Sequence, residues 1–321
     1  MKIVILEGKS VGDDMVFTQF DEFGEVVIYP KTTAEEMPER LKDADILVAN
    51  KLPMNEHTLS GAGNLKLVCL TATGTNNLDT EYLKSRGIQA RNVAGYSTDA
   101  VAQHTFALLF YLWEKLRFYD DFVKSGEYAA GNSFSCFPER FYELKGKTWG
   151  IIGMGAIGQK VAEIASVFGC RILCYSASGS RYDFRDKNYE QTDFDTLLAE
   201  SDILSIHAPL NSYTENLMNL EAFRKMKKEA VLINVARGPI VNQEDLYTAL
   251  TENLIAAAGL DVLKVEPMAE DNPLAKIQDS RKLIITPHMA WAPVETRTRC
   301  LDEVAENIRA FLNSEDRNRV C

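Results

Sequence analysis

The most informative stretch of this 321-residue chain is Lys147-Thr-Trp-Gly-Ile-Ile-Gly-Met-Gly-Ala-Ile-Gly158. Its apolar residues 148–152 predict a β-strand that ends abruptly. The helical apolar period after Ala156 predicts a helix that stops at Gly169. A second apolar run, at residues 171–175, predicts another strand. Strand, helix and strand together form a βαβ unit, so the glycines before the helix lie in the context that a dinucleotide-binding turn requires.

Three glycines in this turn, Gly153, Gly155 and Gly158, have the spacing G-x-G-x-x-G. In a dinucleotide-binding turn the first glycine allows a tight bend, and the second lets the backbone approach a pyrophosphate. The third lets the helix pack closely on the strand. The helix N-terminus at Ala156 and Ile157 offers unpaired N–H groups and a partial positive charge to the phosphates. We therefore predict that these five residues bind a dinucleotide, although a purely structural turn is the alternative.

Composition and charge exclude several classes of protein. The chain has 46% hydrophobic and 25% charged residues, the balance of a soluble globular protein, and it is long enough for two domains. Its net charge of -11 argues against nucleic-acid binding, because there is no basic surplus to neutralise phosphates. No apolar run reaches the roughly 18 residues that a membrane span needs. The first residues predict a β-strand rather than a signal peptide.

The six cysteines are scattered along the chain, and several lie in apolar strand contexts. Reduced, mostly buried thiols in a cytoplasmic protein are the expected result. Cys170 and Cys174 have the spacing C-x-x-x-C, but no second pair has the spacing of a zinc site, so we predict no bound metal.

The chain alternates between short apolar runs and helical patterns, which predicts parallel sheets with helices on both faces. We therefore expect an α/β protein with two doubly wound parallel-sheet domains, the second sheet having about six strands. No residue-level repeat relates the two halves. The predicted strands are residues 2–7, 25–29, 45–49, 67–72 and 88–92 in the first half, and 148–152, 171–175, 203–207, 231–235, 257–262 and 283–286 in the second.

A long helix is predicted from Thr98 to about Arg117, with apolar residues on most faces. It is buried either inside one subunit or against a second subunit, and the sequence leaves both options open. Residues 119–144 are aromatic and irregular, and they are too many for a simple connection, so this segment is expected to be packed or functional. An amphipathic helix at residues 295–313 is expected to return to the first domain.

Two loops of the first half follow predicted strands, where ligands bind in open α/β sheets. One contains Lys51. The other contains Ala72, Thr73 and Gly74, whose small side chains would let backbone N–H groups surround a carboxylate. Taken alone, both are more simply interpreted as ordinary polar loops.

Three ionisable residues of the second half also follow predicted strands: Arg237, Glu266 and His288. The carboxyl ends of parallel strands share one sheet edge, so these side chains are expected on the cofactor side. An arginine can hold a carboxylate with two hydrogen bonds, and a histidine can supply a proton as a carbonyl becomes an alkoxide. A glutamate touching that histidine would favour the imidazolium and fix the ring. Each residue alone is more simply structural, but together they predict hydride-transfer chemistry.

Five motifs, in order and over nearly the whole chain, resemble the D-isomer-specific 2-hydroxyacid dehydrogenase family. They are Gly-Ile-Ile-Gly-Met-Gly-Ala-Ile-Gly (150–158), His-Ala-Pro-Leu (207–210), Asn-Val-Ala-Arg-Gly (234–238), Gly-Leu-Asp-Val (259–262) followed by Glu-Pro (266–267), and Thr-Pro-His-Met-Ala-Trp (286–291). Within the family, the sequence is most similar to the branch of glycerate dehydrogenases, or hydroxypyruvate reductases.

The resemblance implies roles for the candidate residues. Arg237 would anchor the substrate, Glu266 would be the partner of the catalytic histidine, and His288 would donate the proton. The substrate carboxylate would be held by backbone N–H groups, with a lysine close by, at Lys51, Ala72, Thr73 and Gly74. The family fold is a Rossmann NAD(P)-binding domain, here residues 100–289, inserted in a flavodoxin-like substrate domain of residues 1–99 and 290–321. The long helix and the aromatic segment would form a homodimer surface.

Other positions concern the cofactor. By resemblance, Asp261 matches the residue that contacts the nicotinamide carboxamide, with Ala236 beside it. His207 ends a strand near the cofactor edge, where a structural or adenosine-side role is expected. Family members that prefer NAD usually carry an acidic residue where this chain has Ser176. Arg181 could bind a 2′-phosphate, or it could equally be a solvated loop charge. The predicted cofactor is therefore NAD or NADP.

The predicted function is reduction of a small 2-oxo acid, of the hydroxypyruvate or glyoxylate type, by a reduced nicotinamide. The alternative is a dinucleotide-sensing corepressor without metabolic turnover, because related proteins use this fold in that way. Such relatives are expected to carry additional terminal segments. This chain starts at its first strand and ends at its last helix, which favours the enzyme.

Overall fold

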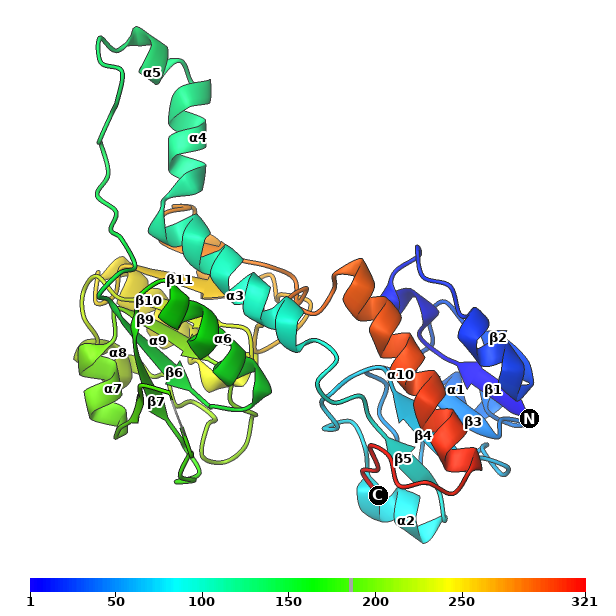
Figure 1. Cartoon of the computed structure of the whole chain (residues 1–321). Coiled ribbons are helices and arrows are strands. Elements are labelled where there is room, and N and C mark those ends of the chain that lie inside the picture. The colour runs from blue at the N-terminus through cyan, green and yellow to red at the C-terminus, as the bar shows by residue number, and fades with distance from the viewer. Residues whose placement is uncertain (185–186) are drawn as a thin grey trace. The chain divides into compact units, whose positions relative to one another are not determined.

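The computed structural model describes residues 1–184 and 187–321 of the chain. These residues divide into two compact units, each built on a sheet of parallel strands (Figure 1). Met1–Ser97 and Trp291–Cys321 form the first unit, and Thr98–Ala290 forms the second. The predicted α/β class, with two parallel-sheet domains, is confirmed.

The first unit has the strand order β2-β1-β3-β4-β5, which is the order of flavodoxin-like folds. Every neighbouring pair is parallel. Each strand begins and ends within about two residues of its prediction, because each is an apolar run bounded by turn residues. The strands are β1 (Lys2–Ile5), β2 (Glu25–Ile28), β3 (Ile46–Ala49), β4 (Leu67–Leu70) and β5 (Gln89–Arg91).

Alternate residues of these strands pack on opposite faces of the sheet. Val4, on one face, belongs to an apolar cluster with α1 (Met37–Arg40) and α2 (Thr80–Ser85). Ile3, on the other face, belongs to a cluster with α10 (Val294–Leu312), the predicted C-terminal helix. The helix at the end of the chain therefore completes the core of the unit that begins the chain.

The last residues of the chain cover the outer edge of β5. The N–H of Ala90 donates to the carbonyl oxygen of Cys321 (3.3 Å), and the N–H of Val320 donates to that of Ala90 (2.8 Å). Arg91 and Arg319 form an antiparallel bridge. The edge strand thus has a partner and does not present a row of unpaired backbone groups.

The second unit has the strand order β12-β11-β10-β9-β6-β7-β8, all parallel, and its central part has the order of a dinucleotide-binding Rossmann domain. The prediction of about six strands misses β8, a three-residue edge strand without a buried residue. Such a strand contains no apolar run, so the sequence pattern does not reveal it. The strands are β6 (Thr148–Ile152), β7 (Arg171–Tyr175), β8 (Tyr189–Gln191), β9 (Ile203–Ile206), β10 (Val231–Asn234), β11 (Ala257–Leu260) and β12 (Leu283–Ile285).

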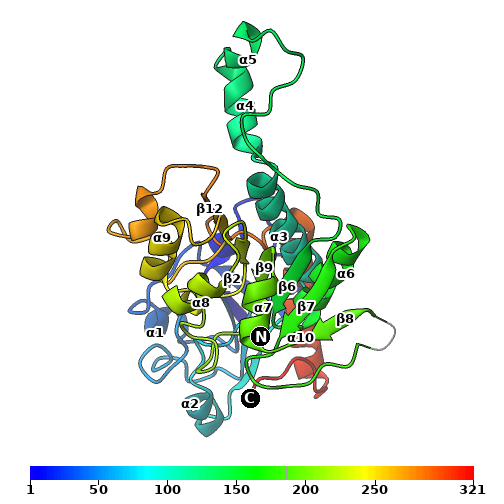
Figure 2. The ribbon, with the colours of Figure 1, turned by 90° about the vertical axis from the view of Figure 1, so that its left-hand side faces the viewer.

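Helices cover both faces of this second sheet. α3 (Thr98–Trp113) and α6 (Ala156–Val167) pack together on one face. α7 (Phe194–Glu200), α8 (Leu220–Lys225) and α9 (Gln243–Thr251) share an apolar cluster with the strands on the other (Figure 2). In the described residues, no helix is long and apolar enough to cross a membrane. Short 3₁₀ helices are η1 (Gly8–Val11), η2 (Thr18–Phe23), η3 (Gly238–Ile240) and η4 (Pro273–Lys276).

A helical arm projects from the second unit after α3 (Figures 1 and 2). Lys115 has a left-handed backbone conformation (φ 52°) and starts a new helix, α4 (Leu116–Lys124), which α5 (Glu127–Ala130) follows. Two predictions are therefore wrong: α3 is shorter than expected, and the aromatic segment is partly helical. Ion pairs one turn apart, such as Arg117 to Asp121 (2.7 Å), stabilise α4, none of whose residues is buried.

One six-residue turn occurs in each unit. After β3 the chain runs Pro53-Met-Asn-Glu-His-Thr58, and after β9 it runs Pro209-Leu-Asn-Ser-Tyr-Thr214. In both, the threonine hydroxyl donates to the proline carbonyl oxygen at 2.7 Å. In both, the asparagine carboxamide oxygen accepts the N–H two residues later, at 3.1 Å and 2.9 Å. The two halves therefore do share a residue-level repeat, which sequence alone hides because only three letters match.

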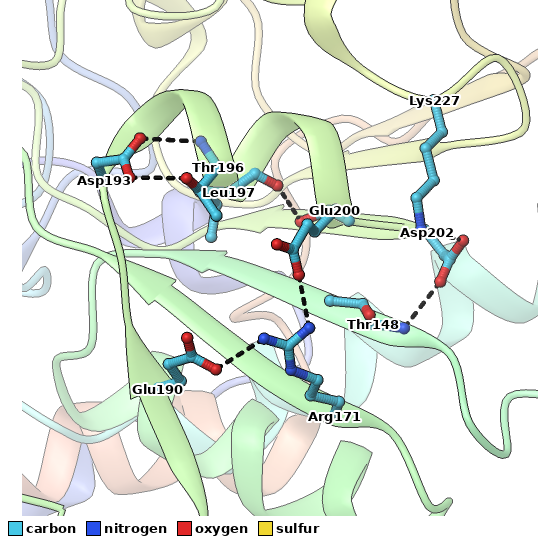
Figure 3. Close-up of polar contacts among 10 residues, drawn as sticks. Thr148, Arg171, Glu190, Asp193, Thr196, Leu197, Glu200, Asp202 and Lys227 are labelled. Atoms are coloured by element: carbon cyan, nitrogen blue, oxygen red, sulfur yellow. Dashed lines mark hydrogen bonds and ion pairs between the residues drawn. The ribbon is translucent and has the colours of Figure 1, made fainter.

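The amino-terminal edge of the second sheet is held by charged side chains (Figure 3). Arg171, which begins β7, donates to Glu190 (2.7 Å) and Glu200 (2.5 Å). Asp202 accepts the N–H of the residue that begins β6 (2.8 Å) and the ammonium of Lys227 (2.9 Å). These contacts are structural, and the candidate functional residues lie at the opposite, carboxyl-terminal edge.

Candidate active site

The glycine-rich turn joins β6 to α6 at the carboxyl edge of the second sheet. Gly153 has φ 92°, and a Cβ there would lie 2.7 Å from the backbone nitrogen of Ala208. A Cβ on Gly158 would lie 2.2 Å from the carbonyl oxygen of Gly153, so only glycine lets α6 pack against the strand end. A Cβ on Gly155 would meet no atom within 4 Å. A tight turn, an open approach and close packing are what a pyrophosphate-binding turn needs.

The N-terminus of α6 is suited to an anion. Its N-cap residue, Gly155, has no side chain that could cap the helix. The first N–H groups of a helix, here those of Ala156 and Ile157, lack intrahelical partners and carry the positive end of the helix dipole. The helices on the opposite face are capped by their own side chains, those of Asp193, Asn219 and Asn242. The residues of this turn therefore fit the pyrophosphate of a dinucleotide.

The end of β7 carries hydroxyl groups and no carboxylate. Ser176 is buried, its Oγ lies 3.2 Å from Ser178 Oγ, and that atom lies 2.9 Å from Ser180 Oγ. Arg181 is exposed and makes no hydrogen bond or ion pair with any residue that the structure describes. A serine neither repels a 2′-phosphate nor binds two ribose hydroxyls as a carboxylate does, so this strand end is compatible with either dinucleotide.

Tyr182 is a residue of this edge that the sequence analysis missed. Its phenolic oxygen accepts the N–H of Met154, in the glycine turn, at 3.3 Å. Its own N–H donates to Gln191 Oε1 (3.0 Å). The tyrosine thus lies against the turn, and no spacing in the sequence indicates this contact between two loops.

His207 follows β9 and ends a buried polar chain. The indole N–H of Trp149 donates to Ser205 Oγ (2.8 Å), which lies 3.0 Å from His207 Nε2. An indole can only donate, so Ser205 Oγ accepts from it, and which atom donates between Ser205 and His207 depends on the tautomer of the imidazole. The second imidazole nitrogen, Nδ1, is buried without a partner among the described residues. Burial lowers the pKa of His207 to about 3, so the ring is neutral at physiological pH.

The structure brings His288 and Glu266 into contact. His288 Nδ1 lies 2.7 Å from Glu266 Oε2, while Glu266 Oε1 accepts the N–H of Leu263 (2.9 Å). The glutamate is thus oriented by its own loop, which follows β11. A carboxylate at Nδ1 favours a proton on that nitrogen and leaves Nε2 to exchange a proton with a ligand. The histidine side chain is 26% exposed, so a ligand can reach it.

Asp261, just after β11, holds the loop that carries His288. Its carboxylate, 1% exposed, accepts the hydroxyl of Thr286 (2.6 Å) and the N–H groups of Met289 and Ala290 (both 2.8 Å). The N–H of His288 donates to the carbonyl oxygen of Asp261 (2.8 Å). His288 itself has φ 54°, a strained value for histidine, and these bonds keep it there. The contact of Asp261 with the nicotinamide stays a prediction.

His104, in α3, completes this network, and the sequence analysis gave it no functional role. Its Nε2 lies 2.9 Å from Thr286 Oγ1 and 3.5 Å from Asp261 Oδ1. Burial opposes ionisation of Asp261, but the hydrogen bonds from His104, Thr286 and the backbone outweigh it, so the pKa of Asp261 lies below its usual value. An ionised carboxylate therefore stands at the centre of the loop.

Arg237 lies after β10 and is half-buried. Its Nη1 donates to the carbonyl oxygen of Ala236 (2.7 Å), and the Asn234 side chain bonds the N–H of Ala236 and the carbonyl of Arg237 (both 3.0 Å). A Cβ on the next residue, Gly238, would lie 2.0 Å from the carbonyl carbon of Leu263. Close contact between these two backbones thus sets the spacing between the arginine and the glutamate of the following loop.

In the first unit, the loop after β4 presents backbone N–H groups. The carbonyl oxygens of Ala72 and Thr73 accept from the N–H of Val93 (3.0 Å) and the side chain of Asn92 (2.7 Å). The Thr73 hydroxyl donates to the carbonyl oxygen of Val93 (2.8 Å). Within the described part of the chain, the N–H groups of Ala72, Thr73 and Gly74 have no hydrogen-bond partner. Three adjacent donors of this kind fit a carboxylate.

The remaining predicted substrate residue, Lys51, is exposed in the loop after β3. β3 and β4 are parallel neighbours, so Lys51 lies at the same sheet edge as the loop of residues 72–74. Among the residues described, no cluster of three His, Cys, Asp or Glu side chains could hold a metal ion.

Residues 106–290 match the family model described as D-isomer specific 2-hydroxyacid dehydrogenase, NAD binding domain. The chain belongs to this family. The dehydrogenase is 35% identical over 324 residues to a hydroxypyruvate reductase of Blautia hydrogenotrophica, with 100% of this chain and 99% of the relative covered. It is 35% identical over 320 residues to a glycerate dehydrogenase of Methylorubrum extorquens, with 99% and 98% covered. The predicted branch of the family is thereby confirmed.

A solved structure, that of an acyclic imino acid reductase in complex with NADPH and D-Arg, has the same fold. Its TM-score is 0.88 at 31% identity, with 100% of both chains covered. Together with the enzyme relatives, this likeness identifies the chain as an NAD(P)-dependent 2-hydroxyacid dehydrogenase. The alternative of a dinucleotide-sensing corepressor is not favoured.

Proposed function

We propose that this dehydrogenase reduces a small polar 2-oxo acid, of the hydroxypyruvate or glyoxylate type, with His288 as the proton donor. The supporting observation is the 2.7 Å contact between His288 Nδ1 and Glu266 Oε2, at the sheet edge that also carries the glycine turn. A carboxylate that orients an imidazole in this way lets Nε2 deliver its proton to one position. The substrate class follows the hydroxypyruvate reductase and glycerate dehydrogenase relatives.

Each of these residues has a defined role in the proposed reaction. In the second unit, Arg237 holds a carboxylate of the substrate and polarises the neighbouring carbonyl. In the first unit, the N–H groups of residues 72–74, with Lys51, are the groups suited to a carboxylate. A bound reduced nicotinamide supplies the hydride for C2 of the substrate. His288 gives its proton to the carbonyl oxygen, which becomes the hydroxyl group. Glu266 stabilises the imidazolium before that transfer.

Oxidation of NADPH and NADH by the purified protein tests this function. Hydroxypyruvate, glyoxylate and pyruvate are compared at equal concentration, and rapid oxidation with either of the first two is expected. The three substrates share the 2-oxo acid group and differ in the rest of the molecule. The order of the rates at which they oxidise the dinucleotide therefore reports which side chain the substrate pocket accepts best. If none of them oxidises a dinucleotide that nevertheless binds tightly, the proposed substrate class is wrong and a sensing role replaces it.

We infer that NADPH is an effective cofactor. The support is the absence of a carboxylate at Ser176, together with the exposed cation of Arg181, six residues after the end of β7 at Tyr175. The similar imino acid reductase binds NADPH. Ser176→Asp would place a charge that repels a 2′-phosphate, so it should raise the KM for NADPH at least about tenfold and lower the KM for NADH. An unchanged ratio of the two KM values contradicts the inference.

We further propose that residues 1–99 and 290–321 bind the substrate, and that residues 100–289 bind the cofactor and carry a homodimer surface on the arm. Phe134 and Phe137, on the return from the arm, are 92% and 82% exposed. Large apolar side chains that are exposed close together are typical of a protein–protein interface. Sedimentation should give a dimer for the wild type and a monomer for Phe134→Asp/Phe137→Asp. A wild-type monomer at micromolar concentration contradicts the proposal.

A further inference from the structure

The strand order of the first sheet reverses between β1 and β3, and at such a point ligands bind in open α/β sheets. Here a side chain of the protein takes that place. The N–H groups of three consecutive residues, Asn50, Lys51 and Leu52, converge on one atom, Oε2 of Glu7, at 2.7, 2.9 and 3.3 Å. Glu7 is half-buried just after β1, and its three donors belong to the loop after β3.

The carbonyl groups of the same loop are held by an amide. Asn77 Nδ2 donates to the carbonyl oxygens of Asn50 (3.3 Å) and Leu52 (2.8 Å). Asn77 lies in the loop after β4, three residues beyond Gly74. The loop that carries Lys51 therefore has its N–H groups bonded on one side and its C=O groups bonded on the other.

Three converging N–H groups form a concave site of the kind that binds an anion. Hydrogen bonds to an ionised acceptor are about twice as strong as neutral ones. If Glu7 were absent, these donors would be available to an anionic substrate or to an anion from solution. Because Glu7 occupies them, the substrate carboxylate is left to the unpaired N–H groups of residues 72–74 in the next loop.

We propose that Glu7 is a positioning residue, a built-in anion that holds the Lys51 loop in the arrangement that receives the substrate. The inference rests on the proposed substrate-binding role of this loop. Glu7 acts through the backbone of residues 50–52. Its loss should therefore weaken substrate binding, while the chemistry and the cofactor binding of the second unit persist.

Steady-state kinetics with hydroxypyruvate test this role in Glu7→Ala and Glu7→Gln. We expect Glu7→Ala to raise KM about tenfold with kcat within about twofold of wild type. The amide oxygen of Glu7→Gln can still accept, so its KM should rise only about threefold. The dissociation constant for NADPH should not change. The matched control is Glu22→Gln, which removes another bonded carboxylate of the first unit, the partner of Arg309, and should leave KM unchanged.

Acetate provides a second readout, because Glu7→Ala removes one CH₂ and one carboxylate. Added acetate should return the KM of Glu7→Ala toward the wild-type value, while it leaves the wild type unchanged or weakly inhibited. A side chain that merely supported the fold would show no such rescue. Amide hydrogen exchange at residues 50–52 needs no turnover, and these three N–H groups should exchange at least about tenfold faster in Glu7→Ala.

Wild-type KM in both variants, or a raised KM that acetate does not restore, overturns the proposal. If Glu7→Ala does not fold, the KM and the exchange rates of Glu7→Gln decide. Failure of the proposed function looks different, because the wild type itself would then not turn over any 2-oxo acid. In that case faster exchange in the variant still supports the internal anion, and unchanged exchange overturns it.

Discussion

The two sheets of this dehydrogenase share one plan and differ most where their strand orders reverse. The order β2-β1-β3-β4-β5 in the first unit corresponds to β7-β6-β9-β10-β11 in the second. In the second unit the reversal contains the turn from Gly153 to Gly158 and an uncapped helix N-terminus. In the first it contains Glu7, whose carboxylate occupies three N–H groups. The same architecture thus carries the predicted dinucleotide-binding turn in one unit, whereas in the other the corresponding N–H groups are bonded by a side chain of the protein itself.

The next loops of the two sheets differ in a related way. The third residue after β4 is Thr73, the third residue after β10 is Arg237, and glycine follows each of them. The first unit offers backbone N–H groups at this place, and the second offers a guanidinium. Under the proposed function both groups bind a carboxylate. The first unit would do so with the partial positive charges of backbone N–H groups, and the second with the full charge of the arginine side chain.

Removing the proposed proton donor of the second unit should have the largest effect. His288→Asn is expected to lower kcat by about 10²–10⁴-fold, because the carboxamide cannot replace an imidazolium as a general acid. Asparagine tolerates the left-handed backbone at this position (φ 54°), so the loop should keep its shape. Kinetics at saturating substrate measure kcat, and NADPH titration checks that cofactor binding survives. A kcat within about threefold of wild type would place the chemistry elsewhere.

The next largest effect should come from the close contact between the loops after β10 and β11. Gly238→Ala places a Cβ 2.0 Å from the carbonyl carbon of Leu263, so the two loops must separate. A displacement of about 1 Å can cost about 10²-fold in rate, so we expect kcat/KM to fall about 10- to 100-fold. The matched control is Gly63→Ala, where a Cβ would meet nothing within 4 Å. Equal kcat/KM in the two variants would show that the spacing between loops is not critical.

His207 and Asn50 occupy the same place in the two units, directly after β9 and β3, but only the histidine titrates. Burial lowers its pKa to about 3, against about 6.5 in the unfolded chain. Between these values the unfolded chain binds the additional proton, so stability falls as the pH falls below about 6.5. From pH 7 to pH 5 the loss should be about 2 kcal/mol, and His207→Asn should remove it.

Urea unfolding of wild type and His207→Asn at both pH values measures this difference. The midpoint of the wild type should fall on acidification by more than that of the variant. If the midpoints of wild type and variant fell equally on acidification, the imidazole would be hydrated in the folded protein, and His207 would contribute no more to the pH dependence of stability than Asn50 does.

The repeated turn should give the smallest effect, and an equal one in both units. Thr58→Val and Thr214→Val keep the shape of the side chain but remove the hydroxyl that donates to Pro53 and Pro209. Both threonines are fully buried, so each variant should lose about 1–2 kcal/mol of unfolding free energy. Unfolding monitored in each unit separately measures the two losses. A loss confined to one unit would show that the shared hydrogen bonds do not have a shared energetic role.

Sequence reasoning succeeds here where the evidence is local. The glycine turn and the positions of Arg237 and His288 follow from strand ends, because the carboxyl ends of parallel strands share an edge. It fails where contacts join distant loops. Nothing in the letters connects Glu7 with Asn50, or His104 with Thr286, since these pairs are 43 and 182 residues apart. Short or exposed elements such as β8 and α4 are also not predicted from the sequence, because they lack a buried apolar stripe.

The first unit is made from both ends of the chain, and this has a consequence for its synthesis. Residues 1–97 leave the ribosome early, but the apolar cluster on the face of their sheet that contains Ile3 is completed by α10. The whole second unit is translated in between, which at about 5–20 residues per second takes on the order of 10–40 s. The second unit is continuous in sequence, so it can complete its hydrophobic core before the first unit does. During that interval the apolar surface that α10 later covers is exposed, and a chaperone that binds nascent chains would have to shield it.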